Sequence, residues 1–278
     1  MHDKKSRPVI VGIDGSKAAL RAALWAAEEA AGRDTVLRLT HVVDPHRDID
    51  AEYDRAYRIL HRAWEAVQSH GPAVKLESDV LQGDPVEELA GASRRAQLVC
   101  VGFKGRNDSG RRMRGSTAAL LARTAFSPVA IVRRRKTDSK ARQRCVIAVL
   151  DESPGSHEVL QVAVGEALIR QAAVLALTPW VPERHDLDSA ESGSVRNQLA
   201  QLLERAEDED TDIALSTAPM PAELLEVLAR RPKVEQLLVL DESRPDLVED
   251  LVGPEARAAL RKCNCSLLII HSAPEDQR

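Results

Sequence analysis

Residues 98–117 read LVCVGFKGRNDSGRRMRGST, a glycine-rich loop between a predicted strand and a predicted helix. The apolar run before Gly102 is typical of a buried strand, and apolar residues at helical spacing follow Thr117. Gly102 and Gly105 have no Cβ, so the backbone there can come close to an anion. Ser116 can cap the helix and offer its hydroxyl and its N–H. A loop of this kind predicts a phosphate-binding site; the alternative is a plain glycine-rich turn before a capped helix.

Positive charge dominates the same loop. Between Phe103 and Arg114 it carries five cations and a single anion. Arg111 and Arg112 are candidate charge-assisted donors to a triphosphate, with ordinary solvated arginines as the alternative. Thr117, at the start of the predicted helix, is a candidate for one more phosphate contact. The charge pattern favours a polyanionic ligand.

The order and spacing of the loop glycines resemble a known signature. Gly102, Gly105, Gly115 and Ser116 match, without a gap, the ATP-binding signature of the universal stress protein family. In that signature two residues separate the first two glycines, nine separate the second from the third, and Ser or Thr follows. Other segments that resemble the family's strands and turns are 9–16, 39–43, 83–89 and 127–132. The resemblance implies that the first half binds ATP, alone or with Mg²⁺.

Three further residues are candidates for the same ligand. Gly12, near the end of the first predicted strand, would let a nucleotide approach closely. Asp14 lies where that strand becomes a Gly-Ser turn. The resemblance favours hydrogen bonds from ribose or adenine to Asp14, and the alternative is an N-cap of the helix that starts near Lys17. Val42 matches a family position that contacts adenine, with a plain strand residue as the alternative.

The two halves of the chain repeat one pattern. Segment 9–14 aligns with 146–151 at an offset of 137 residues, and 128–132 aligns with 266–270 at an offset of 138. Short apolar runs alternate with helical patterns, which predicts parallel sheets with helices on both faces. Ligands of such folds bind beyond the carboxyl ends of the strands. We therefore expect an α/β protein with two tandem, open, twisted, five-stranded parallel sheets of Rossmann-like type, and the resemblance adds that they pair through their last strands.

The periodicity places each predicted element. Strands are predicted at 9–13, 36–43, 74–81, 98–101, 129–132, 146–150, 173–177, 211–216, 237–240 and 267–270. Helices in the first half are predicted at 18–31, 51–68, 86–95 and 117–125. The predicted organisation is a domain over 1–132 with an intact motif, a basic linker over 133–144, a domain over 145–272 with a degenerate motif, and a tail over 273–278.

Composition limits the classes of function. The 278 residues are 44% apolar with a net charge of −4, which gives no general attraction to nucleic acid or to acidic membranes. We see no apolar run long enough to span a bilayer and no signal peptide at the N-terminus. The four cysteines lack Cys-x-x-Cys spacing and are interpreted as reduced thiols. These features predict a cytoplasmic protein.

The second half departs from the motif. Leu240 is taken as the equivalent of Gly102, Ser243 as that of Gly105, and Pro254 as that of Ser116. Proline supplies neither a hydroxyl nor an N–H to a phosphate. Segment 241–252, taken as a loop, carries five anions and one cation, which would repel a triphosphate. We therefore expect a second half that keeps the fold and binds no nucleotide.

No residues of the chain form a recognisable catalytic arrangement. The histidines are scattered, and His41, within a predicted strand, is interpreted as a satisfied structural histidine. The expected function is an ATP-binding regulator of stress tolerance or dormancy that passes nucleotide occupancy to a protein partner. One alternative is an adenine-nucleotide enzyme with slow ATP hydrolysis or nucleotidyl transfer; the other is a nucleotide-free interaction scaffold. An intramolecular pseudo-dimer of the halves, with or without a homodimer of chains, is the expected assembly.

Overall fold

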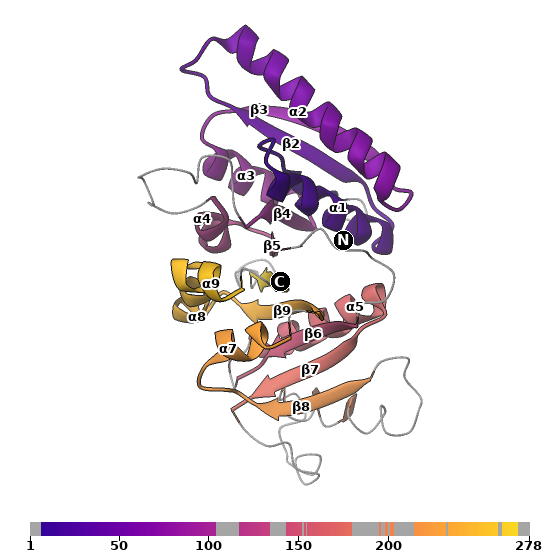
Figure 1. The fold of residues 1–278 in the computed structure, drawn as a ribbon, viewed down its shortest axis with the longest axis vertical. Helices are drawn as coiled ribbons and strands as arrows, with labels where there is room; N and C mark the ends of the chain where they lie inside the picture. The colour runs from indigo at the N-terminus through magenta and orange to yellow at the C-terminus, as the bar shows by residue number, and fades with distance from the viewer. Residues whose placement is uncertain are drawn as a thin grey trace. The chain divides into compact units, whose positions relative to one another are not determined.

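Strands and helices alternate along both halves of the chain in the computed structural model (Figure 1). The structure describes residues 7–103, 117–133, 143–151, 153, 155–179, 195, 198–199, 201–202, 214–231, 233–260 and 263–271. Two compact units are present, residues 1–135 with 248–253 and residues 136–247 with 254–278. Among the described residues, no helix has the length and apolar character needed to cross a membrane.

The first unit contains a parallel sheet. Its elements are β1 (Val9–Gly12), α1 (Lys17–Gly32), β2 (Leu37–Val43), α2 (Ile49–His70), β3 (Leu76–Gln82), α3 (Pro85–Ser93), β4 (Leu98–Gly102), α4 (Thr117–Thr124) and β5 (Val129–Val132). The strand order is β3-β2-β1-β4-β5, and every neighbouring pair is parallel. Helix α1 packs against α2, and α3 packs against α4. The predicted parallel α/β sheet is confirmed.

Local sequence explains where the helices of this unit begin. Ser16 caps α1 because its Oγ accepts the Ala19 N–H at 3.0 Å. Asp48 caps α2 and Asp84 caps α3 in the same manner. Helix α1 presents a face of small side chains to the sheet, including alanines that are completely buried. This face lets α1 lie close to the strands, which matters for the glycines described below.

The second unit repeats this architecture. Its described elements are β6 (Arg144–Val149), α5 (Gly155–Arg170), β7 (Ala173–Thr178), β8 (Leu215–Pro219), α7 (Leu224–Ala229), β9 (Glu235–Asp241), α9 (Pro254–Ala259) and β10 (Asn264–Ile270). Helix α8 (Pro245–Val252) lies between β9 and α9 in the chain, and its residues from Val248 onward are assigned to the first unit. The strand order is β10-β9-β6-β7-β8, again with parallel neighbours. Helix α5 packs on β6 and β9, as α1 does on β1 and β4.

Two predictions for the second half were wrong. Strand β8 extends over Leu215–Pro219 and so ends three residues later than the segment predicted at 211–216, of which residues 211–213 lie outside the described residues. Residues 245–252, taken as part of an acidic loop, form helix α8. Val248, Leu251 and Val252 are buried on one side of α8, and this apolar stripe outweighs the acidic composition.

A buried ion pair recurs at the same place in both units. Glu29 of α1 is completely buried and its Oε2 lies 3.0 Å from Arg33 Nη2. Glu166 of α5 pairs with Arg170 at the same i, i+4 spacing. The two glutamates are separated by the 137-residue offset of the repeat. The pair is therefore a shared structural feature that the periodicity analysis missed.

Candidate functional site

The carboxyl edge of the first sheet brings the candidate residues together. Strands β1 and β4 are neighbours, and the chain continues from them in opposite directions across the sheet, so the switch point lies between them. Gly12 and Gly102 end these strands, and Asp14 follows β1. Thr117 is the first residue of α4. The other predicted ligand residues, Gly105, Arg111, Arg112, Gly115 and Ser116, lie outside the described residues.

Asp14 shapes the turn that follows β1. Its half-buried carboxylate accepts the Ser16 N–H through Oδ1 at 2.8 Å. The helix itself is capped by Ser16, so the alternative that Asp14 is the N-cap of α1 was wrong. Gly15 between them has a φ of 83°, a conformation that favours glycine. The turn thus fixes Asp14 at the switch point.

Close packing explains the glycine at the end of β4 and leaves little space beside the glycine at the end of β1. A Cβ on Gly102 would lie 2.7 Å from the carbonyl carbon of Ala18 and 2.8 Å from the nitrogen of Ala19, both in the first turn of α1. A Cβ on Gly12 would lie 3.1 Å from a methyl of Leu89 in α3. Gly102 therefore lets helix and strand meet at the base of the site, an observed role beside the predicted one toward an anion.

Backbone and side-chain contacts anchor the start of the glycine-rich loop. The Phe103 N–H donates to the Val132 carbonyl at 3.1 Å. The guanidinium carbon of Arg133 lies 3.3 Å from the centroid of the Phe103 ring, a cation–π contact. Strand β5 thereby holds the point at which the loop leaves β4. Sequence reasoning missed this pair, because its members are adjacent only through the sheet.

His41 joins the ends of β1 and β2. It is buried, and its Nδ1 lies at hydrogen-bond distance from the Ile13 carbonyl oxygen. A carbonyl only accepts, so Nδ1 carries the proton and donates. The interpretation of His41 as a satisfied structural histidine is confirmed, and the contact also steadies the residue before Asp14. Val42 is half-buried in β2; its contact with adenine stays a prediction.

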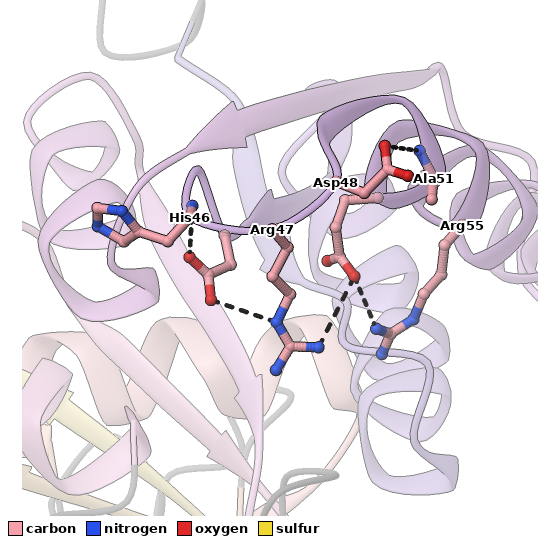
Figure 2. Close-up of polar contacts among 7 residues, drawn as sticks. His46, Arg47, Asp48, Ala51 and Arg55 are labelled. Carbon is pink, nitrogen blue, oxygen red and sulfur yellow. Dashed lines mark hydrogen bonds and ion pairs between the residues drawn. The ribbon is translucent and has the colours of Figure 1, made fainter.

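A polar network fixes the loop between β2 and α2 (Figure 2). Asp44 accepts the His46 N–H at 3.0 Å and Arg47 Nε at 3.3 Å. Glu52 lies 3.2 Å from Arg55 and 3.9 Å from Arg47, so Arg47 bridges the loop and the helix. The His46 N–H is the main reason that the pKa of Asp44 is lowered. We call residues 44–52 the acidic rim. The sequence analysis missed this network, although all of its members lie between Asp44 and Arg55 in the sequence.

Pairing in the second sheet corrects the sequence alignment of the halves. In the first sheet Val9 pairs with Leu98, and in the second sheet Val146 pairs with Leu237. Continuing both registers to the strand ends aligns Gly102 with Asp241. The assignment of Leu240 to this place was therefore wrong by one residue. A carboxylate stands where the first unit has a glycine.

Asp151, the equivalent of Asp14, is held by its own turn. Its Oδ1 accepts from the Ser153 N–H at 2.9 Å and from Ser156 Oγ at 2.7 Å, and Arg244 lies 3.8 Å from Oδ2. Partial burial raises the pKa of Asp151, but the hydrogen bonds from Ser153 and Ser156 outweigh it and hold the pKa below its ordinary value.

Ser156→Ala is expected to raise the pKa of Asp151 toward the ordinary value of 3.8, because a hydrogen bond to the ionised form is lost. An NMR titration of the carboxyl carbon measures the change. A depressed folded-state pKa stabilises the protein above the unfolded-state value, and this stabilisation disappears as the pH falls through the folded-state value. The stability gap between wild type and variant should therefore narrow from pH 7 to pH 3; a constant gap would contradict the assignment.

Comparisons with known proteins identify the family. The model of the universal stress protein family matches residues 5–133 and again residues 143–271. The universal stress protein Rv2028c of Mycobacterium tuberculosis is 34% identical over 273 residues, which cover 96% of each chain. The crystal structure of a universal stress protein from Archaeoglobus fulgidus has the same fold, with a TM-score of 0.68, 15% identity and 99% of each chain covered.

One solved universal stress protein is a complex with cAMP; it matches 46% of this chain and 96% of its own, at 30% identity and a TM-score of 0.38. The assignment of this chain to a family does not depend on that match. Two copies of the family model together span nearly the whole sequence, and the tuberculosis relative aligns from end to end. The chain therefore belongs to the universal stress protein family and carries two domains of that family in tandem.

Proposed function

We propose that the first unit binds one adenine nucleotide, ATP with or without Mg²⁺, and that the protein is a nucleotide-dependent regulator of stress tolerance or dormancy. One observation carries this proposal. Strand β4 ends at Gly102 and helix α4 begins at Thr117, so the glycine and serine motif spans a strand end and a helix start at the switch point. This is where a phosphate group gains most from backbone N–H groups and the helix dipole.

Charge suggests how the nucleotide would be oriented. The glycine-rich loop carries an excess of cations in the sequence. The rim over residues 44–52 carries four acidic side chains and a single arginine, and Arg47 is already engaged by Asp44 and Glu52. A triphosphate is attracted by the first region and repelled by the second. We therefore propose that the phosphates face the loop, that adenine lies toward Val42, and that Asp14 accepts from ribose or adenine between them.

We propose that the site senses nucleotide and does not catalyse a reaction. Among the described residues, His41 and Asp14 at this edge are both engaged in structural hydrogen bonds. Nucleotide occupancy would change the surface that the first unit offers to a regulatory protein partner in the cytoplasm. Slow ATP hydrolysis is the enzymatic alternative, and a purified sample that releases phosphate from ATP at a rate abolished by a site variant would favour it.

Gly115→Val is expected to weaken ATP binding at least tenfold, about 1.4 kcal/mol or more, because a β-branched side chain would stand at the third motif glycine. Isothermal titration of the full-length chain, with and without Mg²⁺, measures affinity and stoichiometry. Wild type should bind one ATP per chain. Gly110→Val is the matched control, since Gly110 lies in the same loop outside the motif and its replacement should change affinity far less.

Two results would overturn the proposal. The first is a folded Gly115→Val variant, with an unchanged circular dichroism spectrum, that binds ATP as tightly as wild type. The second is a wild-type chain that binds no adenine nucleotide at millimolar concentration.

A further inference from the structure

The end of β9 carries a buried carboxylate that its counterpart in the first unit lacks. Asp241 is only 4% exposed, and its Oδ1 accepts the Ser243 N–H at 2.7 Å. Its register position is that of Gly102. Asp241 therefore lies at the switch point of the second sheet, at the end of β9 beside β6.

The helix that follows β6 is adapted to this carboxylate. A Cβ placed on Gly155, the first residue of α5, would lie 2.1 Å from Asp241 Oδ2 and 2.5 Å from its Cγ. A side chain at position 155 would therefore force the Asp241 carboxylate to move. At the repeat offset of 137 residues, the equivalent of Gly155 is Ala18, the residue whose backbone lies against Gly102 in the first unit. The same contact between helix and strand thus has its glycine on the strand in the first unit (Ala18 with Gly102). In the second unit the glycine is on the helix (Gly155 with Asp241).

Charge at the second switch point is correspondingly reversed. Asp241 ends β9, Asp151 follows the neighbouring strand β6, and Asp246 lies in the segment after Asp241. Arg244 lies 3.8 Å from Asp151 Oδ2. A phosphate approaching the end of β9 would meet a buried carboxylate where the first unit has a glycine.

We propose that Asp241 determines which of the two units binds nucleotide, because it keeps phosphate away from the second unit. Its buried carboxylate stands at the switch point, where the first unit has a glycine, and repels a phosphate group there. This inference rests on the proposed function of the first unit. The double substitution Asp241→Gly/Gly155→Ala gives the second unit the same two residue types as Ala18 and Gly102 of the first unit. This variant should bind a nucleotide in its second unit.

The contact itself is tested by stability, without any nucleotide. Gly155→Ala alone should lower the melting temperature by about 4 °C, because the new methyl group collides with a buried carboxylate. The same substitution in an Asp241→Gly background should cause no loss. If Gly155→Ala is tolerated equally in both backgrounds, Asp241 does not occupy this space and the inference is wrong, whatever the first unit binds.

The specificity is tested by equilibrium dialysis of the full-length chain with labelled AMP, whose charge is smaller than that of ATP. Wild type should bind one AMP, and the Asp241→Gly/Gly155→Ala variant should bind a second with at least tenfold weaker affinity, because the acidic residues of α8 remain. Asp246→Asn is the control: it removes one negative charge from an exposed position of the same segment and should leave the count at one. A folded double variant that still binds one AMP would overturn the role of Asp241. A wild type that binds neither AMP nor ATP would instead refute the proposed function.

Discussion

Replacing Gly102 with alanine is expected to cost about 2 kcal/mol of unfolding free energy and to abolish measurable ATP binding. The added Cβ would stand 2.7 to 2.9 Å from three atoms of Ala18 and Ala19, two of which are backbone atoms. Backbone atoms of a capped helix cannot rotate away, so α1 and β4 must separate. Separation moves Asp14 and the start of the glycine-rich loop relative to each other. Urea denaturation and ATP titration of the same sample measure the two losses.

Gly91→Ala is the control for Gly102→Ala. Gly91 lies within α3, and a Cβ there would meet nothing within 4 Å. Alanine in a helix interior is favoured over glycine by up to about 1 kcal/mol, so this variant should be as stable as wild type or more stable, with unchanged ATP affinity. If both variants behave alike, the packing of Gly102 on α1 is not what limits the site.

Apolar periodicity was sufficient to predict the positions of strands that are buried on both faces. Strand β5 extends over Val129–Val132, as the unbroken apolar run indicates, and all of its residues are buried. Strand β8 was misplaced because it is an edge strand with half-buried and exposed residues, so it carries no apolar run. It also ends at Pro219, a residue that edge strands tolerate. A strand that is partly exposed lacks the continuous apolar run on which the prediction relies.

The candidate site shows a different limit. The glycine spacing located Gly102, but the reason for a glycine there depends on how closely α1 approaches β4, which follows from tertiary packing. The match between Gly102 and Asp241 depends on the strand ladder, because a one-residue change in loop length is invisible to an alignment of weakly similar halves. The domain boundaries and the pairing of the closing strands, Val129–Val132 and Leu267–Ile270, stay predictions.

Arg33→Ala should destabilise the protein by about 3 kcal/mol, because it removes the guanidinium partner of a completely buried carboxylate. Arg33 donates to Glu29 Oε2 through two nitrogens, at 3.0 and 3.3 Å. Breaking such a pair costs more than replacing both residues by apolar ones, so Glu29→Met/Arg33→Ala should recover most of the lost stability.

Arg230→Ala is the control at the same i, i+4 spacing. The side chain of Arg230 is 75% exposed and that of its partner Glu226 is 61% exposed, so this pair should contribute less than about 0.5 kcal/mol. Urea denaturation measures all three variants, and equal losses for Arg33→Ala and Arg230→Ala would show that burial of Glu29 does not decide the cost.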